Sequence, residues 1–390
     1  MGASRVTSPG SRHVPRDPTM TIDCSEADCA VGNPLERPRW LAVICLVLIG
    51  VGSLGAALGN PVNQRRFAVI GSIHANAGLW DYAVVDAQSQ RLYLADAGVL
   101  ALDLATGRIT PQLIHGTLTH GIVSLGDGVM AVADGARHRV VIFDGKTGRI
   151  LHEIQTGAPA GSENWHDPDA LVFDEKTNTL IAVNGDSGTL ALIDWRKSAL
   201  VGMIRVGGKL EFAAAGHGGA LYVNVASQNE LAVISVSTRK FVRHFPLPGC
   251  NEPTGLAYDQ KLNLTISACS NGKADFINPD TGMLRAQVDI GTGCDAVELD
   301  RSRQVAYFPA GDSGILTIVA VNDWKSIHVI QTLRTALGVR LGAVNPKTGF
   351  LYLPAVNYDM KAPRVKLPGL PPLLAPLRSS FRFLMVAPVR

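Results

Sequence analysis

The chain has 390 residues, a formal net charge of +3, 46% hydrophobic residues and 40 glycines. Its length is enough for one large core or for several ordinary domains. The charge is close to neutral and the basic residues are scattered, so nucleic acid is not supported as a partner, although it is not excluded. The glycine content suits an all-β chain with many tight turns.

The first 59 residues differ from the rest. Residues 1–39 are polar, contain several prolines and show no apolar periodicity, which predicts a disordered leader. Residues 40–59, WLAVICLVLIGVGSLGAALG, carry no charge over a length that can cross a bilayer. Arg37 and Arg39 favour a cytoplasmic N-terminus, whereas Ala57 to Gly59 fits a signal-peptidase site. The segment is therefore either a cleaved signal sequence or a retained anchor.

Both alternatives export the chain from residue 60 onward. A cleaved signal sequence would release it into the periplasm or another extracytoplasmic compartment. A retained segment would tether it to the inner membrane by one N-terminal span, so that the membrane is contacted through this segment alone.

Residues 60–390 contain an internal repeat. A short apolar segment that opens with a mostly polar residue recurs at a spacing of about 43 residues, the period of four-stranded propeller blades. The seven copies begin at Asp81, His120, Asp169, Glu211, Thr254, Asp295 and Arg340. Each copy is followed by three further segments with strand-like alternation and glycine-bearing turns, such as RLYLAD, RVVIFDGKTGR and LVGMIRVGG. The sequence predicts an all-β, seven-bladed β-propeller.

The predicted strands near the two ends complement each other. RFAVIGSIH, from Arg66, reads as a fourth strand with no blade before it, and FRFLMVAPV, from Phe381, reads as a third strand with no fourth after it. Pairing them would complete blade seven and remove exposed sheet edges. Residues 361–380 are rich in proline, so we expect an excursion inside this blade and not a central strand.

Three cysteines lie in the predicted propeller. Cys250 precedes the inner strand of the fifth blade, and Cys269 ends the next strand, so antiparallel pairing brings the two residues together. In an exported protein this arrangement predicts a Cys250–Cys269 disulfide and a free Cys294. Two buried thiols are the alternative.

The segment NWHDPDALVFD places a histidine and carboxylates at the start of the third inner strand. Its Asp169 occupies the position that opens the inner strand in every repeat, and these positions converge at one end of the channel. The predicted channel mouth contains Asp81, His120, His166, Asp169, Glu211, Glu252, Asp295 and Arg340, with Lys209 nearby. Convergent polar groups in a concave mouth predict a ligand site. The alternative is that they only cap strands and face water.

The same residues leave the chemistry open. Carboxylates suit calcium or magnesium, and His120 or His166 would admit zinc, but no H-x-H or calcium-loop motif is present. A metal-dependent hydrolase or lactonase-like enzyme at the mouth is therefore the alternative function, and a divalent cation is not the favoured cofactor. A quinoprotein is disfavoured, because Trp195 and Trp324 are predicted in turns on the opposite face.

LYVNVASQNELAVISVSTRKFVRHFPLPG, residues 221–249, resembles the YVTN-type repeat, and DPDALVFD and CNEPTGLAYD are similar to YncE-like members of that family. The resemblance covers residues 66–390 and implies an exported propeller. It also implies that single-stranded DNA is a ligand to consider, since that activity has been proposed for YncE-like proteins. A propeller hosts many activities. We expect an exported binding or scaffold module, not an enzyme, that recognises an unknown protein or small ligand at the mouth and at residues 361–380.

Overall fold

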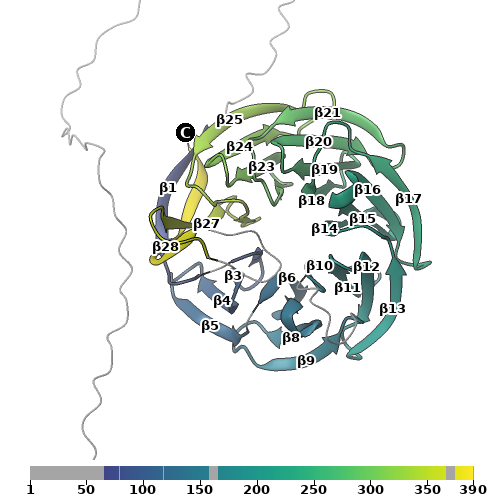
Figure 1. Ribbon diagram of the computed structural model, residues 1–390, viewed down its shortest axis with the longest axis horizontal. Helices are drawn as coiled ribbons and strands as arrows, with labels where there is room; N and C mark the ends of the chain where they lie inside the picture. Colours follow the sequence, from purple (N-terminus) through teal and green to yellow (C-terminus); the bar gives the residue numbers. More distant parts are fainter. Residues whose placement is uncertain (1–65, 79, 117, 158–165, 366–373, 390) are drawn as a thin grey trace, which may run out of the picture.

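The computed structural model describes residues 66–78, 80–116, 118–157, 166–365 and 374–389. Seven antiparallel sheets of four strands each surround a central axis (Figure 1). This arrangement confirms the predicted seven-bladed, all-β propeller. The leader and residues 40–59 lie outside the described residues. Among the residues that the structure describes, no helical segment has the length and apolarity of a membrane span.

The first three blades run from the innermost to the outermost strand in chain order. Blade 1 contains β2 (Ala83–Asp86), β3 (Arg91–Asp96), β4 (Gly98–Asp103) and β5 (Ile109–His115). Blade 2 contains β6 (Thr119–Gly126), β7 (Val129–Asp134), β8 (Arg139–Asp144) and β9 (Ile150–Gln155), with the 3-10 turn η1 (Gly135–Arg137). Blade 3 contains β10 (Leu171–Asp174), β11 (Thr179–Asn184), β12 (Thr189–Asp194) and β13 (Ala199–Arg205).

The next three blades follow the same order. Blade 4 contains β14 (Leu210–Ala215), β15 (Ala220–Val225), β16 (Glu230–Ser235) and β17 (Lys240–Pro246), with the turns η2 (His217–Gly219) and η3 (Ala226–Gln228). Blade 5 contains β18 (Pro253–Asp259), β19 (Leu264–Cys269), β20 (Lys273–Asn278) and β21 (Met283–Asp289). Blade 6 contains β22 (Glu298–Asp300), β23 (Val305–Ala310), β24 (Ile315–Ala320) and β25 (His328–Arg334).

Blade 7 joins the two ends of the propeller. It contains β26 (Ala343–Val344), β27 (Leu351–Asp359), β28 (Ala375–Val389) and β1 (Arg66–His74), in that order across the sheet. The β1–β28 register runs from Arg66 opposite Val389 to His74 opposite Arg382. The predicted closure of the ring by the N- and C-terminal strands is therefore confirmed.

The core lies between the blades and follows the apolar pattern of the middle strands. In β3, the residues from Leu92 to Ala95 are at most 1% exposed. Such continuous apolar runs form because neighbouring blades cover both faces of these strands. The outer strands are more exposed, and a register shift such as that between Val233 and Ile234 interrupts the pairing of β16 with β17. Bulges of this kind protect an outer edge from pairing with other chains.

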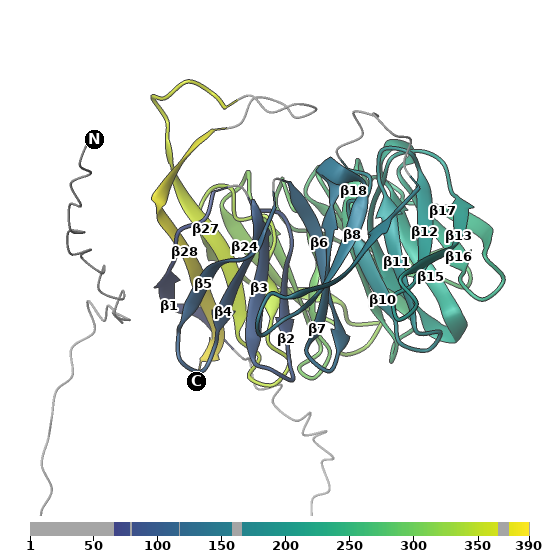
Figure 2. The same ribbon diagram turned by 90° about the horizontal axis from the view of Figure 1, so that it is seen from below.

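Strands β27 and β28 extend beyond the body of blade 7 as a hairpin, which rises above the other blades in Figure 2. Their pairing continues outward to Asp359 opposite Ala375. Strand β28 therefore begins earlier than the sequence suggested, inside the range expected for the proline-rich excursion. Pro376 is accommodated there because β1 pairs with β28 only from Arg382 onward, so this part of β28 has a free edge. Residues 366–373 lie outside the described residues.

Candidate functional site at the channel mouth

The candidate site lies at the end of the channel where the inner strands begin. The same face carries the turns between the second and third strands of each blade, and in blade 7 the corresponding connection is the β27–β28 hairpin. We call the charged residues gathered here the mouth cluster. It consists of Asp81, His120, His166, Asp169, Lys209, Glu211, Asp295 and Arg340. These residues come from six of the seven blades.

Backbone hydrogen bonds fix the start of each inner strand. The amide of Asp81 donates to the carbonyl of Ala95 at 3.0 Å, and the amide of Asp169 donates to Val183 at 2.8 Å. A further bond joins neighbouring blades, because the amide of Gly121 donates to the carbonyl of Asp169 at 2.7 Å. Backbone hydrogen bonds alone therefore fix the positions of these strand starts relative to one another.

Glycine is required at position 121 by this close approach. A Cβ atom there would lie 2.5 Å from the amide nitrogen of Leu171 and 2.7 Å from the carbonyl oxygen of Asp169. Only a residue without a side chain lets the two backbones approach so closely. The close approach places His120, the preceding residue, beside Asp169.

His120 lies between two carboxylates. Its Nδ1 is 2.6 Å from Oδ2 of Asp81 and 3.6 Å from Oδ1 of Asp169. The Asp169 side chain is 6% exposed, and among the described residues nothing donates a hydrogen bond to its carboxylate. Asp81, His120 and Asp169 each offer one potential ligand atom, and these atoms lie within 4.8 Å of one another.

The surroundings separate the acidities of the two carboxyl groups. Burial raises the pKa of Asp169 well above its usual value, and the charges of Glu211 and Asp81 add to this shift. Burial also acts on Asp81, but the hydrogen bond and charge of His120, together with the charge of Arg340, bring the pKa of Asp81 below its usual value. Asp81 is therefore the ionised partner of His120, whereas Asp169 favours its protonated form.

His166, Asp167 and Asp169 of the NWHDPD segment have three different roles. His166 Nδ1 lies 3.2 Å from Oδ2 of Asp186, and this hydrogen bond raises the pKa of the imidazole against the opposing effect of burial. Asp167 accepts hydrogen bonds from the amides of Asp186 and Ser187, so it caps the β11–β12 turn. Only Asp169 opens the inner strand. Among the described residues of this segment, Asp167 is structural, whereas His166 and Asp169 reach the mouth cluster.

The two cations of the mouth cluster are paired with carboxylates. Arg340 Nε lies 2.5 Å from Oδ2 of Asp295, and its Nη2 donates to the carbonyl of Trp80 at 3.0 Å. Burial, only partly offset by Arg340, raises the pKa of Asp295 to about 6. Lys209 Nζ lies 2.8 Å from Oε1 of Glu211. Arg340 also lies 4.0 Å from Oδ1 of Asp81, so it is shared between two carboxylates, and the charged group closest to Asp169 is the imidazole of His120.

An aromatic pair lies one residue further along two inner strands. The rings of Tyr82 and Phe212 are stacked, with centroids 4.4 Å apart and an interplanar angle of 20°. They come from blades 1 and 4, so they meet across the channel axis. Burial raises the pKa of Tyr82 well above its usual value, and the charges of Asp169 and Asp81 contribute. The pair forms an apolar floor beneath the mouth cluster.

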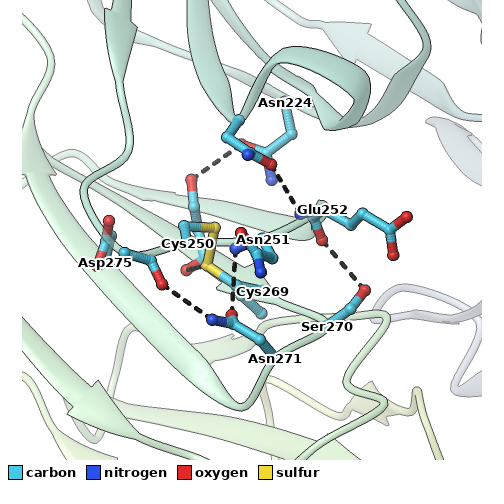
Figure 3. The surroundings of a disulfide bond; sticks show 12 residues. Asn224, Cys250, Asn251, Glu252, Cys269, Ser270, Asn271 and Asp275 are labelled. Atoms are coloured by element: carbon cyan, nitrogen blue, oxygen red, sulfur yellow. Dashed lines mark hydrogen bonds between the residues drawn. A yellow bond between two sulfur atoms is a disulfide. The ribbon is translucent and has the colours of Figure 1, made fainter.

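Glu252 has a described contact of a different kind, made by its backbone. It is exposed, its amide donates to Oδ1 of Asn229, and its side chain extends away from the neighbouring disulfide (Figure 3). That disulfide joins Cys250 to Cys269 at the start of β18. Cys294 is free and buried, so it is not available to a ligand at the mouth.

The base of the β27–β28 hairpin contacts the rim of the mouth. Tyr358 packs directly on Gly338, where a Cβ atom would collide with the phenol hydroxyl and where φ is +79°. Burial raises the pKa of Tyr358, and nearby Arg340 partly opposes this effect. Further out, Met360 is 67% exposed. The hairpin and the mouth cluster therefore form one continuous surface.

Sequence reasoning missed two kinds of residue at the mouth. Asp186 is one of these residues, and its only signal in the sequence is its position in the β11–β12 turn on the mouth face. Tyr82 and Phe212 follow Asp81 and Glu211 in the repeats, but no local pattern indicates that residues of blades 1 and 4 meet. Their stacking depends on the diameter of the closed ring.

A shallow pocket of about 240 Å³ opens on the opposite face, between blades 4 and 5. Its polar groups are paired with one another, since the Tyr258 hydroxyl donates to Asn263, which in turn donates to Asp280. Trp195 and Trp324 also lie in turns on this opposite face, each beneath an arginine side chain. The indole Nε1 of Trp195 is buried and has no hydrogen-bond partner, but among the described residues no charged side chains from several blades converge there as they do at the mouth.

Comparison with known proteins identifies relatives by family and by fold. The family model described as "Outer membrane protein assembly factor BamB" matches residues 95–349. No curated protein matches the chain. Among solved structures, a chain of hydrazine synthase from Kuenenia stuttgartiensis is 12% identical with a TM-score of 0.61, over 72% of this chain and 94% of that chain. A chain of the mitotic checkpoint complex is 14% identical with a TM-score of 0.59, over 80% and 95% respectively. At these identities the two structures support the fold alone.

Proposed function

Since this chain belongs to the family described as outer membrane protein assembly factor BamB, we propose that it is an exported binding or scaffold module. Its recognition surface is the mouth cluster together with the β27–β28 hairpin. One observation carries the proposal: charged side chains from six blades meet at one end of the channel, beside the stacked rings of Tyr82 and Phe212. A concave site with convergent polar groups is suited to binding.

The family description supports a location outside the cytoplasm. A factor in the assembly of outer membrane proteins acts beyond the inner membrane, and the uncharged residues 40–59 provide an export signal in our proposal. The YVTN-type pattern of residues 221–249 further suggests a place near the YncE-like propellers. Both points agree with a module that acts in the periplasm, released or tethered.

The hairpin extends the surface that a partner can contact. It stands on the mouth face, and Tyr358 links its base to the Arg340 side of the cluster. Leu377 and Met360 are large apolar side chains exposed along it. A partner with an apolar contact segment beside charged groups would match this combination, because apolar area and charge complementarity together give affinity and specificity.

Site-specific photo-crosslinking in the full chain tests the proposal. A photoreactive amino acid at Met360 is expected to give a discrete protein adduct in cells that export the chain. The same amino acid at Met283, which is 53% exposed on the outer strand β21, is the matched control. Adducts that form only from Met283, or equally from both positions, would contradict recognition at the mouth face.

A charge-neutral double variant shows whether the mouth cluster takes part. Asp295→Asn combined with Arg340→Gln removes both members of one ion pair, and Asp81, which lies 4.0 Å from Arg340, keeps its contact with His120. We expect the Met360 adduct to decrease strongly in this background while the fold is retained. An unchanged adduct would limit recognition to the hairpin.

A second candidate function is a metal-dependent hydrolase at the same mouth. The observation in its favour is the set of potential ligand atoms on Asp81, His120 and Asp169. A metal held there could activate water for hydrolysis. Turnover of ester or lactone substrates that is lost in Asp169→Asn would favour this candidate over a binding module.

A further inference from the structure

We propose that the mouth cluster holds a divalent metal ion of the zinc class, with Asp81, His120 and Asp169 as its protein ligands. The proposal rests on the mouth being the binding surface of the protein, and it specifies what the deepest part of that surface binds. It can be tested independently of any protein partner.

The three side chains are close enough to share one ion. Their ligand atoms lie within 4.8 Å of one another, with 2.6 Å between His120 Nδ1 and Asp81 Oδ2 and 3.6 Å between His120 Nδ1 and Asp169 Oδ1. Ligand atoms of a tetrahedral zinc site are about 3.3 Å apart. Small rotations of the side chains would open the first distance and adjust the others, without movement of the strands.

The strands that carry these side chains hold them in register. Asp81, His120 and Asp169 belong to three consecutive blades, and the bond from Gly121 to the Asp169 carbonyl joins two of them directly. Because a Cβ atom at position 121 would collide with this carbonyl, the separation of the two strands is set by the backbone. A site on rigid elements needs little reorganisation to bind its ion.

Asp169 provides an independent sign that a cation belongs there. Its side chain is 6% exposed and, within the described part of the chain, accepts no hydrogen bond. Buried carboxylates are unfavourable unless they are hydrogen-bonded, paired with a charge or bound to a metal. Lys209 is paired with Glu211, and Arg340 lies between Asp295 and Asp81, so the imidazole of His120, 3.6 Å away, is the charged group closest to Asp169. A divalent ion at this point would stabilise the ionised form of Asp169.

The donor set favours zinc over calcium. Calcium takes six to eight oxygen ligands, whereas zinc accepts imidazole nitrogen and carboxylate oxygen at low coordination number. Three protein ligands leave one position of a tetrahedral site open to water. His166 is the neighbouring imidazole, with its ring centroid 5.3 Å from that of His120.

His166 is oriented in the manner of a metal-binding histidine. Its Nδ1 interacts with Oδ2 of Asp186 at 3.2 Å, which directs Nε2 away from that carboxylate. A carboxylate on the outer nitrogen is the usual partner of a histidine at a metal site. His166 is therefore suited to approach the open position, either as a fourth ligand or through the bound water.

The test uses the untagged full chain, stripped of metal with a chelator and titrated separately with Zn²⁺, Co²⁺, Ca²⁺ and Mg²⁺. We expect one equivalent of Zn²⁺ to bind and to raise the melting temperature, because an ion that binds only the folded state stabilises it. We also expect Co²⁺ to give the intense visible absorption of a tetrahedral site. The absence of stoichiometric Zn²⁺ binding, or binding of Ca²⁺ alone, would overturn the proposal.

Variants locate the site. Asp169→Asn should weaken Zn²⁺ binding by more than about tenfold, because it removes a direct ligand. It breaks no hydrogen bond, so we expect it to fold. Asp127→Asn is the matched control, since Asp127 is exposed in the β6–β7 turn on the opposite face with φ of +50°, a conformation that asparagine tolerates. Equal loss in both variants would overturn the assignment.

The Co²⁺ spectrum keeps the proposal testable if Asp169→Asn fails to fold. The spectrum of the wild-type protein is then sufficient. Nitrogen and oxygen ligands give visible bands without strong charge transfer in the near ultraviolet. A thiolate-to-cobalt charge-transfer band would assign the ion to a cysteine and overturn the proposal. Retained crosslinking from Met360 together with absent metal binding would overturn this inference and leave the proposed binding function intact.

Discussion

Replacing Glu298 by glutamine should stabilise the fold at alkaline pH. Glu298 opens β22, the innermost strand of blade 6, and burial raises its pKa to about 8, only partly opposed by a hydrogen bond from the backbone of Val344. In the unfolded chain the same carboxyl titrates near pH 4.5. Between these values the folded state binds one more proton than the unfolded state, so the free energy of unfolding decreases as pH rises.

The size of the change in the free energy of unfolding follows from the pKa shift of Glu298. Each pKa unit corresponds to about 1.4 kcal/mol, so the full shift corresponds to about 5 kcal/mol at most. Glu298 is partly exposed, and screening by water reduces this value. We therefore expect Glu298→Gln to raise the free energy of unfolding by about 2 kcal/mol at pH 9 and by less than about 0.5 kcal/mol at pH 4.5, where the wild-type carboxyl is protonated in the folded state.

Urea denaturation of both proteins at pH 4.5, 7 and 9, followed by circular dichroism, measures this difference. Glu175→Gln is the control, because Glu175 is exposed in the turn between β10 and β11 and should give no pH-dependent change. A difference that is the same at all three pH values, or destabilisation by Glu298→Gln at pH 9, would refute the reasoning. Either result would mean that Glu298 is ionised in the folded protein and has a favourable partner.

Two further predictions concern the closure of the ring by β1 and β28 and the disulfide of blade 5. Deleting residues 381–390 should abolish the cooperative unfolding transition, because it removes the fully buried Phe381 and leaves β1 without a partner strand. A truncated protein that melts like the full chain in calorimetry would argue against closure of the ring by these strands. Peptide mapping of the unreduced protein after alkylation should find Cys250 linked to Cys269 and Cys294 alkylated; a linked Cys294 peptide would contradict the pairing.

The repeat in the sequence was sufficient to predict the number of blades and how the ring closes. Each blade is built from local hairpins, and its apolar runs and glycine turns depend on neighbours close in sequence. The complementary strands at Arg66 and Phe381 required only the rule that sheet edges are not left open. The start of β28 at Ala375 was not predicted. Proline is tolerated at a free strand edge, and the sequence does not show which edge is free.

The chemistry of the mouth was decided by tertiary structure. Seven positions are equivalent in the repeats, yet His120 is the imidazole that lies between Asp81 and Asp169, because the backbone contact of Gly121 with Asp169 draws two blades together. Asp186 reaches His166 from a turn, whereas Glu252 is exposed immediately before β18. These contacts depend on the diameter of the closed ring and on side-chain directions across it. Both are set by the packing of all the blades together, so the sequence of any one blade does not contain them.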